Sequence, residues 1–218
     1  MSFAIAIDGP AASGKSTIAR KLAEELCYNF INSGGMYRSV AWAAWKREVD
    51  VKDPERVCEL VDSLDLQCGM VNRRSTVTVD GVDPGEELTH EEVNFRVSHI
   101  AKVAEVREIL VYKQREYLNL GPLVMEGRDI GSVVFPETPY KIYIDASAQV
   151  RAQRRQGEGG ADAILLRDQQ DSQREISPLK VADGATVIDS SDMDVSQTLE
   201  AVLDVLRTQG LPTLIENS

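Results

Sequence analysis

The chain contains the pattern G-x-x-x-x-G-K-S at Gly9–Ser16, directly after the short apolar run Phe3–Ile7. An amphipathic helical pattern follows, with apolar residues up to Leu26. A glycine-rich turn between a buried strand and a helix directs backbone N–H groups, and the positive end of the helix dipole, at a bound phosphate. In this setting the pattern predicts the phosphate-binding loop of a protein that binds a nucleoside triphosphate.

Two side chains of this loop are expected to take part in the chemistry. Lys15 should reach the β- and γ-phosphates of the triphosphate, and the Ser16 hydroxyl should ligate the accompanying Mg²⁺. The whole loop is the predicted ATP site, with Gly9, Pro10, Ala11, Ala12, Ser13, Gly14, Lys15, Ser16 and Thr17. The alternative, a glycine-rich turn that merely caps an ordinary helix, is disfavoured by the apolar strand in front of it.

Composition and charge narrow the class of protein. The chain has 218 residues and a net charge of −11, which disfavours a nucleic-acid polymer as partner because phosphate-backbone binding needs a cationic surface. Its three widely spaced cysteines are typical of reduced intracellular thiols. No apolar run is long enough for a membrane span or a signal-peptide core. We therefore expect a cytoplasmic, monomeric enzyme that acts on small molecules, away from membranes.

The strand pattern predicts an α/β fold. Apolar runs without alternation, typical of strands covered on both faces, alternate with helical patterns. These runs are Phe3–Ile7, Asn29–Ile31, Pro122–Glu126, Tyr140–Ile144 and Ala185–Ile188. They predict a doubly wound, five-stranded parallel sheet with its ligand cleft at the carboxyl ends of the strands. The phosphate loop, Ser33–Gly34 and Gly127–Asp129 follow the first three strands and should meet there.

The pattern changes between the second and third of these strands. Residues at about 65–84 are rich in β-formers around the turn Asn72–Arg74, which predicts a small antiparallel insertion. Thr89–Glu92 then fits the capping-box pattern and predicts the start of a helical stretch that reaches about Leu118, with a break near Ala101.

Arginines stand where a phosphoryl-transfer site would need them. Such catalysis is mainly positioning and neutralisation of charge on the transferring oxygens. Arg38 and Arg128 follow the second and third strands, and Arg154 lies on a helical pattern after the fourth. Residues 156–174 begin with a glycine-rich break and bear further charged residues on one helical side, namely Arg167, Asp171 and Arg174. We interpret this segment as a short lid that closes over the phosphates.

Three motifs resemble those of one family. They are N-S-G-G-M-Y-R at Asn32–Arg38, E-G-R-D-I-G at Glu126–Gly131 and V-V-F-P at Val133–Pro136. Together they resemble bacterial cytidylate kinases, which are nucleoside monophosphate kinases with a phosphate loop, and the resemblance runs nearly end to end. It implies one kinase domain over residues 1–218, with an acceptor-binding region at 33–100 that includes the insertion, and the lid.

The resemblance also implies a reaction and roles for residues. The reaction is ATP-dependent phosphorylation of CMP and dCMP to CDP and dCDP, with Mg²⁺. Lys15, Arg128 and Arg174 would be catalytic, and Arg154 would join the ATP site. The implied CMP site comprises Ser33, Tyr37, Arg38, Ser98, Arg107, Arg128, Asp129, Arg167 and Asp171. Among these, Asp129 would accept a hydrogen bond from the cytosine amine, where uracil presents a carbonyl.

Two alternatives stay open at this stage. One is a related kinase that acts on UMP or on a shikimate-like acid, and the other is a nucleotide-binding switch without catalysis. A GTPase-type switch would need D-x-x-G and N-K-x-D segments, and neither occurs in the chain. A second pocket with paired acidic and basic groups favours a kinase, because a switch needs no acceptor site. The relative use of CMP, dCMP and UMP and the range of donors are left open.

Overall fold

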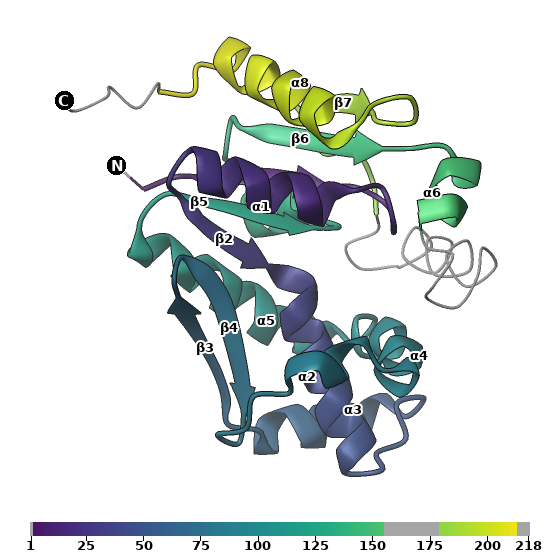
Figure 1. Ribbon diagram of the computed structural model, residues 1–218. Helices are drawn as coiled ribbons and strands as arrows, with labels where there is room; N and C mark the ends of the chain where they lie inside the picture. Colours follow the sequence, from purple (N-terminus) through teal and green to yellow (C-terminus); the bar gives the residue numbers. More distant parts are fainter. Residues whose placement is uncertain (1, 155–178, 213–218) are drawn as a thin grey trace.

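The protein is described here by a computed structural model that covers residues 2–154 and 179–212. Within these residues one sheet has seven strands in the order β3-β4-β2-β5-β1-β6-β7 (Figure 1). The strands are β1 (Ala4–Asp8), β2 (Asn29–Asn32), β3 (Leu66–Val71), β4 (Arg74–Val79), β5 (Leu123–Gly127), β6 (Lys141–Asp145) and β7 (Thr186–Asp189). Parallel pairing joins β2, β5, β1, β6 and β7, which confirms the predicted parallel sheet for this part.

The insertion is where the predicted strand count was wrong. Strands β3 and β4 form an antiparallel hairpin, as expected, but β4 also pairs in parallel with β2, so that the hairpin extends the main sheet from five strands to seven. The backbone N–H of Phe30 donates to the carbonyl of Arg73 over 2.7 Å. The outer edge of β2 would otherwise leave such groups unpaired, and a neighbouring strand removes that cost.

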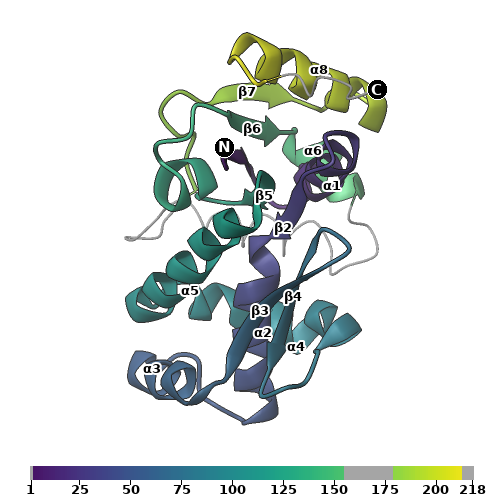
Figure 2. The same ribbon diagram turned by 90° about the vertical axis from the view of Figure 1, so that its left-hand side faces the viewer.

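Helices cover both faces of the sheet (Figures 1 and 2). They are α1 (Lys15–Glu25), α2 (Ser33–Lys46), α3 (Pro54–Ser63), α4 (Glu91–Ile100), α5 (Ala104–Glu116), α6 (Ala148–Arg154) and α8 (Val195–Thr208). Successive side chains of β1 point to opposite faces, so Ile5 and Ile7 join an apolar cluster with α1 and α8. Ala4 and Ala6 join a second cluster with α2 and α5. The sheet is thus doubly wound, as the uninterrupted apolar runs predict.

Three short turns of helix complete the described elements. Two are 3-10 turns at Gly85–Thr89 and Tyr117–Leu120, and one is a π turn at Ile130–Val134 that directly follows β5. No helix in the described part of the chain combines the length and the apolar character that crossing a membrane requires.

For the helical stretch after the insertion, the predicted break was correct and the predicted N-cap residue was wrong. It divides at Ala101 into α4 and α5, as expected. The N-cap of α4 is His90, whose side chain accepts a hydrogen bond from the N–H of Glu92, not Thr89. Thr89 ends the preceding 3-10 turn, and its hydroxyl donates to the carbonyl of Glu86 over 2.8 Å. The hydroxyl of Thr89 is therefore used within the preceding 3-10 turn and does not cap α4.

Candidate active site

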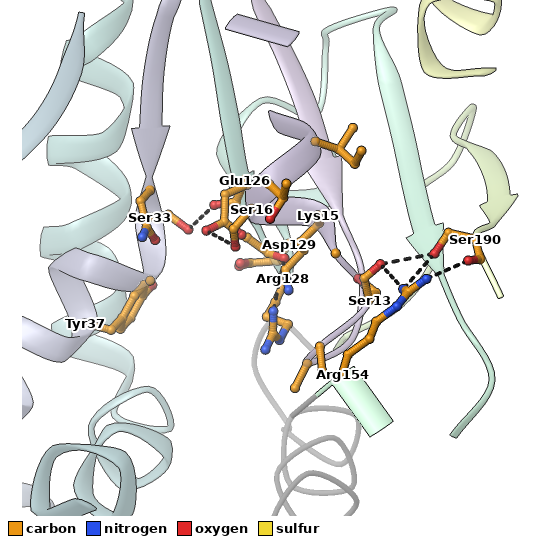
Figure 3. A pocket seen from close by; sticks show the side chains of 18 of the residues that line it. Ser13, Lys15, Ser16, Ser33, Tyr37, Glu126, Arg128, Asp129, Arg154 and Ser190 are labelled. Carbon is orange, nitrogen blue, oxygen red and sulfur yellow. Dashed lines mark hydrogen bonds between the residues drawn. The ribbon is translucent and has the colours of Figure 1, made fainter. Parts of the chain in front are cut away.

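A cavity of about 740 Å³ lies at the carboxyl ends of β1, β2 and β5. The structure brings together there the phosphate loop, the start of α2 and the residues after β5, the three segments that the sequence predicted to meet (Figure 3). The lining residues that the sequence assigned to a site are Ala11, Ala12, Ser13, Gly14, Lys15, Ser16, Thr17, Ser33, Tyr37, Arg38, Ser98, Arg107, Arg128, Asp129 and Arg154.

The backbone of the phosphate loop needs glycine at its first position. Gly9 has a φ of +153°, and a Cβ there would lie 2.1 Å from the carbonyl oxygen of Ile144 in β6. Gly14, with a φ of +91°, is the N-cap of α1. Neither Gly9 nor Pro10 is among the residues that line the cavity. They support the loop instead, and the Pro10 carbonyl accepts a hydrogen bond from Lys15 Nζ at 3.0 Å.

The hydroxyl of Ser16 faces a carboxylate that the sequence analysis missed. Its Oγ donates to Glu126 Oε1 over 2.9 Å, and Glu126 is buried at 5% exposure near the end of β5. Ile7 pairs with Glu126 across β1 and β5, so strand register sets this contact. The sequence did carry a signal for this contact, namely an acidic residue near the end of a predicted strand whose carboxyl end should lie beside the phosphate loop.

These oxygens suit Mg²⁺. A hydroxyl and a carboxylate are hard ligands of the kind this ion prefers, and Mg²⁺ usually takes one or two carboxylates together with phosphate oxygens and water. Among residues 2–154 and 179–212 no group of three or more His, Cys, Asp or Glu side chains could hold a metal by itself. The donor set therefore fits a metal that arrives with the triphosphate.

Arg154 connects the phosphate loop to the last strand. Its Nη1 donates to the Ser13 carbonyl and to Ser190 Oγ, both over 3.1 Å, and its Nη2 donates to the Ser190 carbonyl over 2.7 Å (Figure 3). Arg151, one helical turn earlier, donates to the Ala11 carbonyl over 3.3 Å. Sequence reasoning missed the β7–α8 connection, whose residues also line the cavity: Ser190, Met193, Asp194 and Val195. The signal for these residues in the sequence was their position directly after the carboxyl end of the last predicted strand.

Polar groups on the opposite side of the cavity come from α2. Ser33 Oγ donates to the Glu126 carbonyl over 2.7 Å, which holds the start of α2 against β5 (Figure 3). Arg38, on the next turn, donates through Nη1 to the Leu88 carbonyl at 2.7 Å and to Asn94 Oδ1 at 2.8 Å. These contacts hold the Arg38 guanidinium at the cavity wall.

A buried ion pair lies between these two sides. Arg107 of α5 donates to Asp129, and their side chains are 4% and 8% exposed. The guanidinium carbon of Arg107 lies 5.6 Å from the ring centroid of Tyr37, and Ser98 is buried in the same wall. Arg128 points into the cavity region and donates to the Gly9 carbonyl at 3.1 Å. This wall thus offers the fixed carboxylate of Asp129 beside the cations Arg107 and Arg128.

The remaining predicted positions are not described. Arg167, Asp171 and Arg174, together with the whole predicted lid at 156–174, lie outside the described residues.

Fold and site together define a class of protein. A phosphate loop after the middle one of five parallel strands in a doubly wound sheet, facing polar groups on the other wall of the same cavity, is the arrangement of a P-loop kinase. A solved thymidylate kinase from Candida albicans has this fold, with a TM-score of 0.50 and 12% identity over 100% of this chain and 96% of that chain.

Sequence comparison identifies the family. The sequence profile of cytidylate kinase matches residues 5–208. A cytidylate kinase of Caldicellulosiruptor bescii is 40% identical over 212 residues, which cover 92% of this chain and 94% of that protein. A cytidylate kinase of Bacillus cereus is 38% identical over 215 residues, which cover 94% and 96%. The chain belongs to the cytidylate kinase family, as its motifs indicated.

Proposed function

We propose that the protein transfers the γ-phosphoryl group of ATP to CMP or dCMP, giving ADP and CDP or dCDP. Membership of the cytidylate kinase family supports this reaction. The single observation that carries it in the fold is one cavity that holds both a phosphate loop and the buried Arg107–Asp129 pair. A non-catalytic nucleotide switch would have no use for the second of these.

The donor side would bind the triphosphate of ATP. Backbone N–H groups of the loop and the N-terminus of α1 favour its negative charge. Lys15, which already lies inside the loop, would follow the charge that moves onto the β–γ bridging oxygen. Arg154 would add a cation at the mouth of the loop, where it lines the cavity.

Ser16 and Glu126 would hold the Mg²⁺ that accompanies ATP. When bound, the metal neutralises charge on the β- and γ-phosphate oxygens. The hydrogen bond between Ser16 and Glu126 keeps the two side chains near one another before ATP arrives.

The acceptor side would bind the monophosphate of CMP. Ser33, Arg38 and Arg128 line the same cavity, and a hydroxyl and two guanidinium groups are donors that suit a phosphate dianion. The acceptor oxygen is already anionic, so the transfer needs no general base. What these residues supply is position and charge neutralisation, which is the greater part of catalysis in phosphoryl transfer.

Asp129 would read the base. Its carboxylate is held by Arg107 at the cavity wall, where the cytosine amine can donate to it. Uracil would turn a carbonyl oxygen toward the same carboxylate and leave two acceptors face to face. Because an unsatisfied buried polar group costs about 1–3 kcal/mol, we expect CMP to be preferred over UMP by about tenfold to a few hundredfold in kcat/KM.

The variant Asp129→Asn tests this assignment. An amide donates to the uracil carbonyl, so kcat/KM for CMP should fall and the CMP-to-UMP ratio should narrow. The measurement is ADP release with CMP, dCMP, UMP, AMP and water as acceptors. Glu137→Gln is the matched control, because it makes the same charge change at an exposed position in the following segment. A parent enzyme that uses CMP and UMP equally, or a ratio unchanged in the variant, contradicts the role of Asp129.

We further propose that the enzyme works as a cytoplasmic monomer on small molecules. The net charge of −11 supports the choice of small molecules, since a polynucleotide would be repelled while mononucleotides meet the local arginines.

A further inference from the structure

Asp8 is a buried acidic residue to which the reaction above gives no role. It is the last residue of β1 and is 3% exposed. Its Oδ1 accepts the backbone N–H of Ile130 and its Oδ2 that of Gly131, both at 2.8 Å. Both oxygens of a single carboxylate therefore hold the backbone directly after Arg128 and Asp129.

A second contact ties the same two segments together. Arg128 Nη1 donates to the carbonyl of Gly9, the residue after Asp8. The approach is also close: a Cβ on Gly131 would lie 3.3 Å from Asp8 Oδ2 and 3.3 Å from Lys141 Cδ. The loop after β5 thus lies against the start of the phosphate loop with little room to shift.

We propose that Asp8 is a positioning residue whose ionised carboxylate holds the loop with Arg128 and Asp129 in register with the phosphate loop, so that acceptor and donor phosphates align. The inference rests on the proposed function, because it assigns the acceptor site to that loop. Ionisation is essential to it, since protonation turns one of the two acceptor oxygens into a hydroxyl and weakens the hydrogen bond that this oxygen accepts.

The surroundings of Asp8 place its titration in the working range. Burial raises its pKa to about 7, against the opposing effect of the two backbone hydrogen bonds. The charged groups that act on it are Asp129, which raises the pKa, and Lys15 of α1, which lowers it. On the sheet its register neighbours are Gly127 of β5 and Tyr143 of β6, and the ammonium of Lys141 donates away, to the carbonyls of Pro136 and Asp183.

Activity and stability should consequently move in opposite directions with pH. The pKa of Asp8 in the unfolded chain is near the ordinary value of 3.8, so folding favours its protonated form. The stability that this group contributes is complete below about pH 4 and is lost as pH rises to about 7. The ionised form of Asp8, which the alignment of the two phosphates needs, becomes populated only near the upper end of this pH range. A merely structural acid would not couple the two profiles.

The experiment compares Asp8→Asn with Ser132→Ala by kcat/KM, KM and melting temperature from pH 5.5 to 9. Ser132 is the matched control because it lies on the same turn and its buried hydroxyl has no hydrogen-bond partner in the described part of the chain. At pH 8 we expect Asp8→Asn to lower kcat/KM for CMP about tenfold to a hundredfold, the usual worth of a hydrogen bond to a charged group. The KM for ATP should change less than about twofold.

The pH profile gives the decisive readout. In the parent, kcat/KM for CMP should fall below about pH 7. In Asp8→Asn it should fall only below about pH 6, where the substrate phosphate takes up a proton. The fall in melting temperature from pH 5.5 to 8 should be smaller in Asp8→Asn than in the parent. Ser132→Ala should follow the parent in every measurement.

Three results would overturn the inference: a fall of kcat/KM below about pH 7 that is unchanged in Asp8→Asn, a KM for ATP that rises by more than about twofold in Asp8→Asn, or the same losses in Ser132→Ala. If Asp8→Asn does not fold, Gly131→Ala takes its place, because it crowds the carboxylate from the loop side and should also weaken use of CMP selectively. Failure of the proposed function looks different, since the parent itself would then not phosphorylate CMP.

Discussion

Lys15 is 5% exposed, although lysine is among the residues that proteins bury least. The fold holds its ammonium inside the phosphate loop through the Pro10 carbonyl. At the scale of single residues, the site therefore stores positive charge before any substrate is present. Such pre-organised charge is effective because it need not reorganise when the phosphoryl group moves.

Removal of the Lys15 ammonium tests this view. We expect Lys15→Ala to lower kcat/KM by about a hundredfold or more, because the lost cation would stabilise the transition state more than bound ATP. Lys21→Ala, at an exposed position of the same helix, should leave kcat/KM nearly unchanged. Near-normal turnover by a correctly folded Lys15→Ala protein would show that the lysine does not serve the chemistry.

At the scale of elements, one ion pair joins α5 to the loop after β5. Arg107 and Asp129 are almost fully buried, and Arg107 also donates to the carbonyl of Ala101 at the break between α4 and α5. The pair thus connects the junction of α4 and α5 to the parallel sheet. A buried pair of this kind adds little net stability, yet loss of one partner leaves the other charge uncompensated.

The variant Arg107→Met measures that cost. We expect the free energy of unfolding to fall by about 3–5 kcal/mol, because the carboxylate of Asp129 stays buried without its partner. Arg207→Ala is the control: its pair with Asp204 on α8 is 63% exposed on both sides, and loss of such a surface pair costs less than about 1 kcal/mol. Urea unfolding measures both, and equal losses would contradict the structural role of the buried pair.

At the scale of the whole molecule, the cavity lies where several parts of the chain meet. The phosphate loop and α1 border it on one side, and α2, α4 and α5 border it on the other. Helix α1 packs in one apolar cluster, while α2 and α5 pack in the other on the opposite face of the sheet. A ligand in the cavity therefore adds contacts between both parts and should stabilise the fold as a whole.

Thermal denaturation with CMP tests that expectation. A ligand at a hundred times its Kd stabilises the folded state by about 2.7 kcal/mol, which for a chain of this size raises Tm by about 5–10 °C. Arg38→Ala, which removes a proposed phosphate contact, should reduce the shift at the same CMP concentration, and UMP should shift the parent less than CMP. No shift with CMP in a folded parent would argue against a CMP site.

Much of this architecture could be predicted from local patterns. The phosphate loop, the five parallel strands and the break at Ala101 each show in a run of neighbouring residues. The prediction of Thr89 as an N-cap was wrong for the same reason. The capping-box pattern is local, and the hydroxyl of Thr89 is used by the preceding 3-10 turn instead. The sequence predicted the β3–β4 hairpin, but the place of this hairpin beside β2 depends on pairing between segments that are far apart in the chain.

From the sequence alone one could predict the phosphate loop after the first strand, the parallel sheet and the family, because residues close in the chain carry each of these signals. The tertiary structure alone decided which distant groups meet: Ser16 with Glu126, Asp8 with Gly131, and Ser13 with Ser190, which are 110, 123 and 177 residues apart. Strand order and register set those contacts, and they depend on backbone pairing and burial summed over the whole sheet. A side chain's neighbours in space are therefore a property of the packed fold, and no short stretch of sequence encodes them.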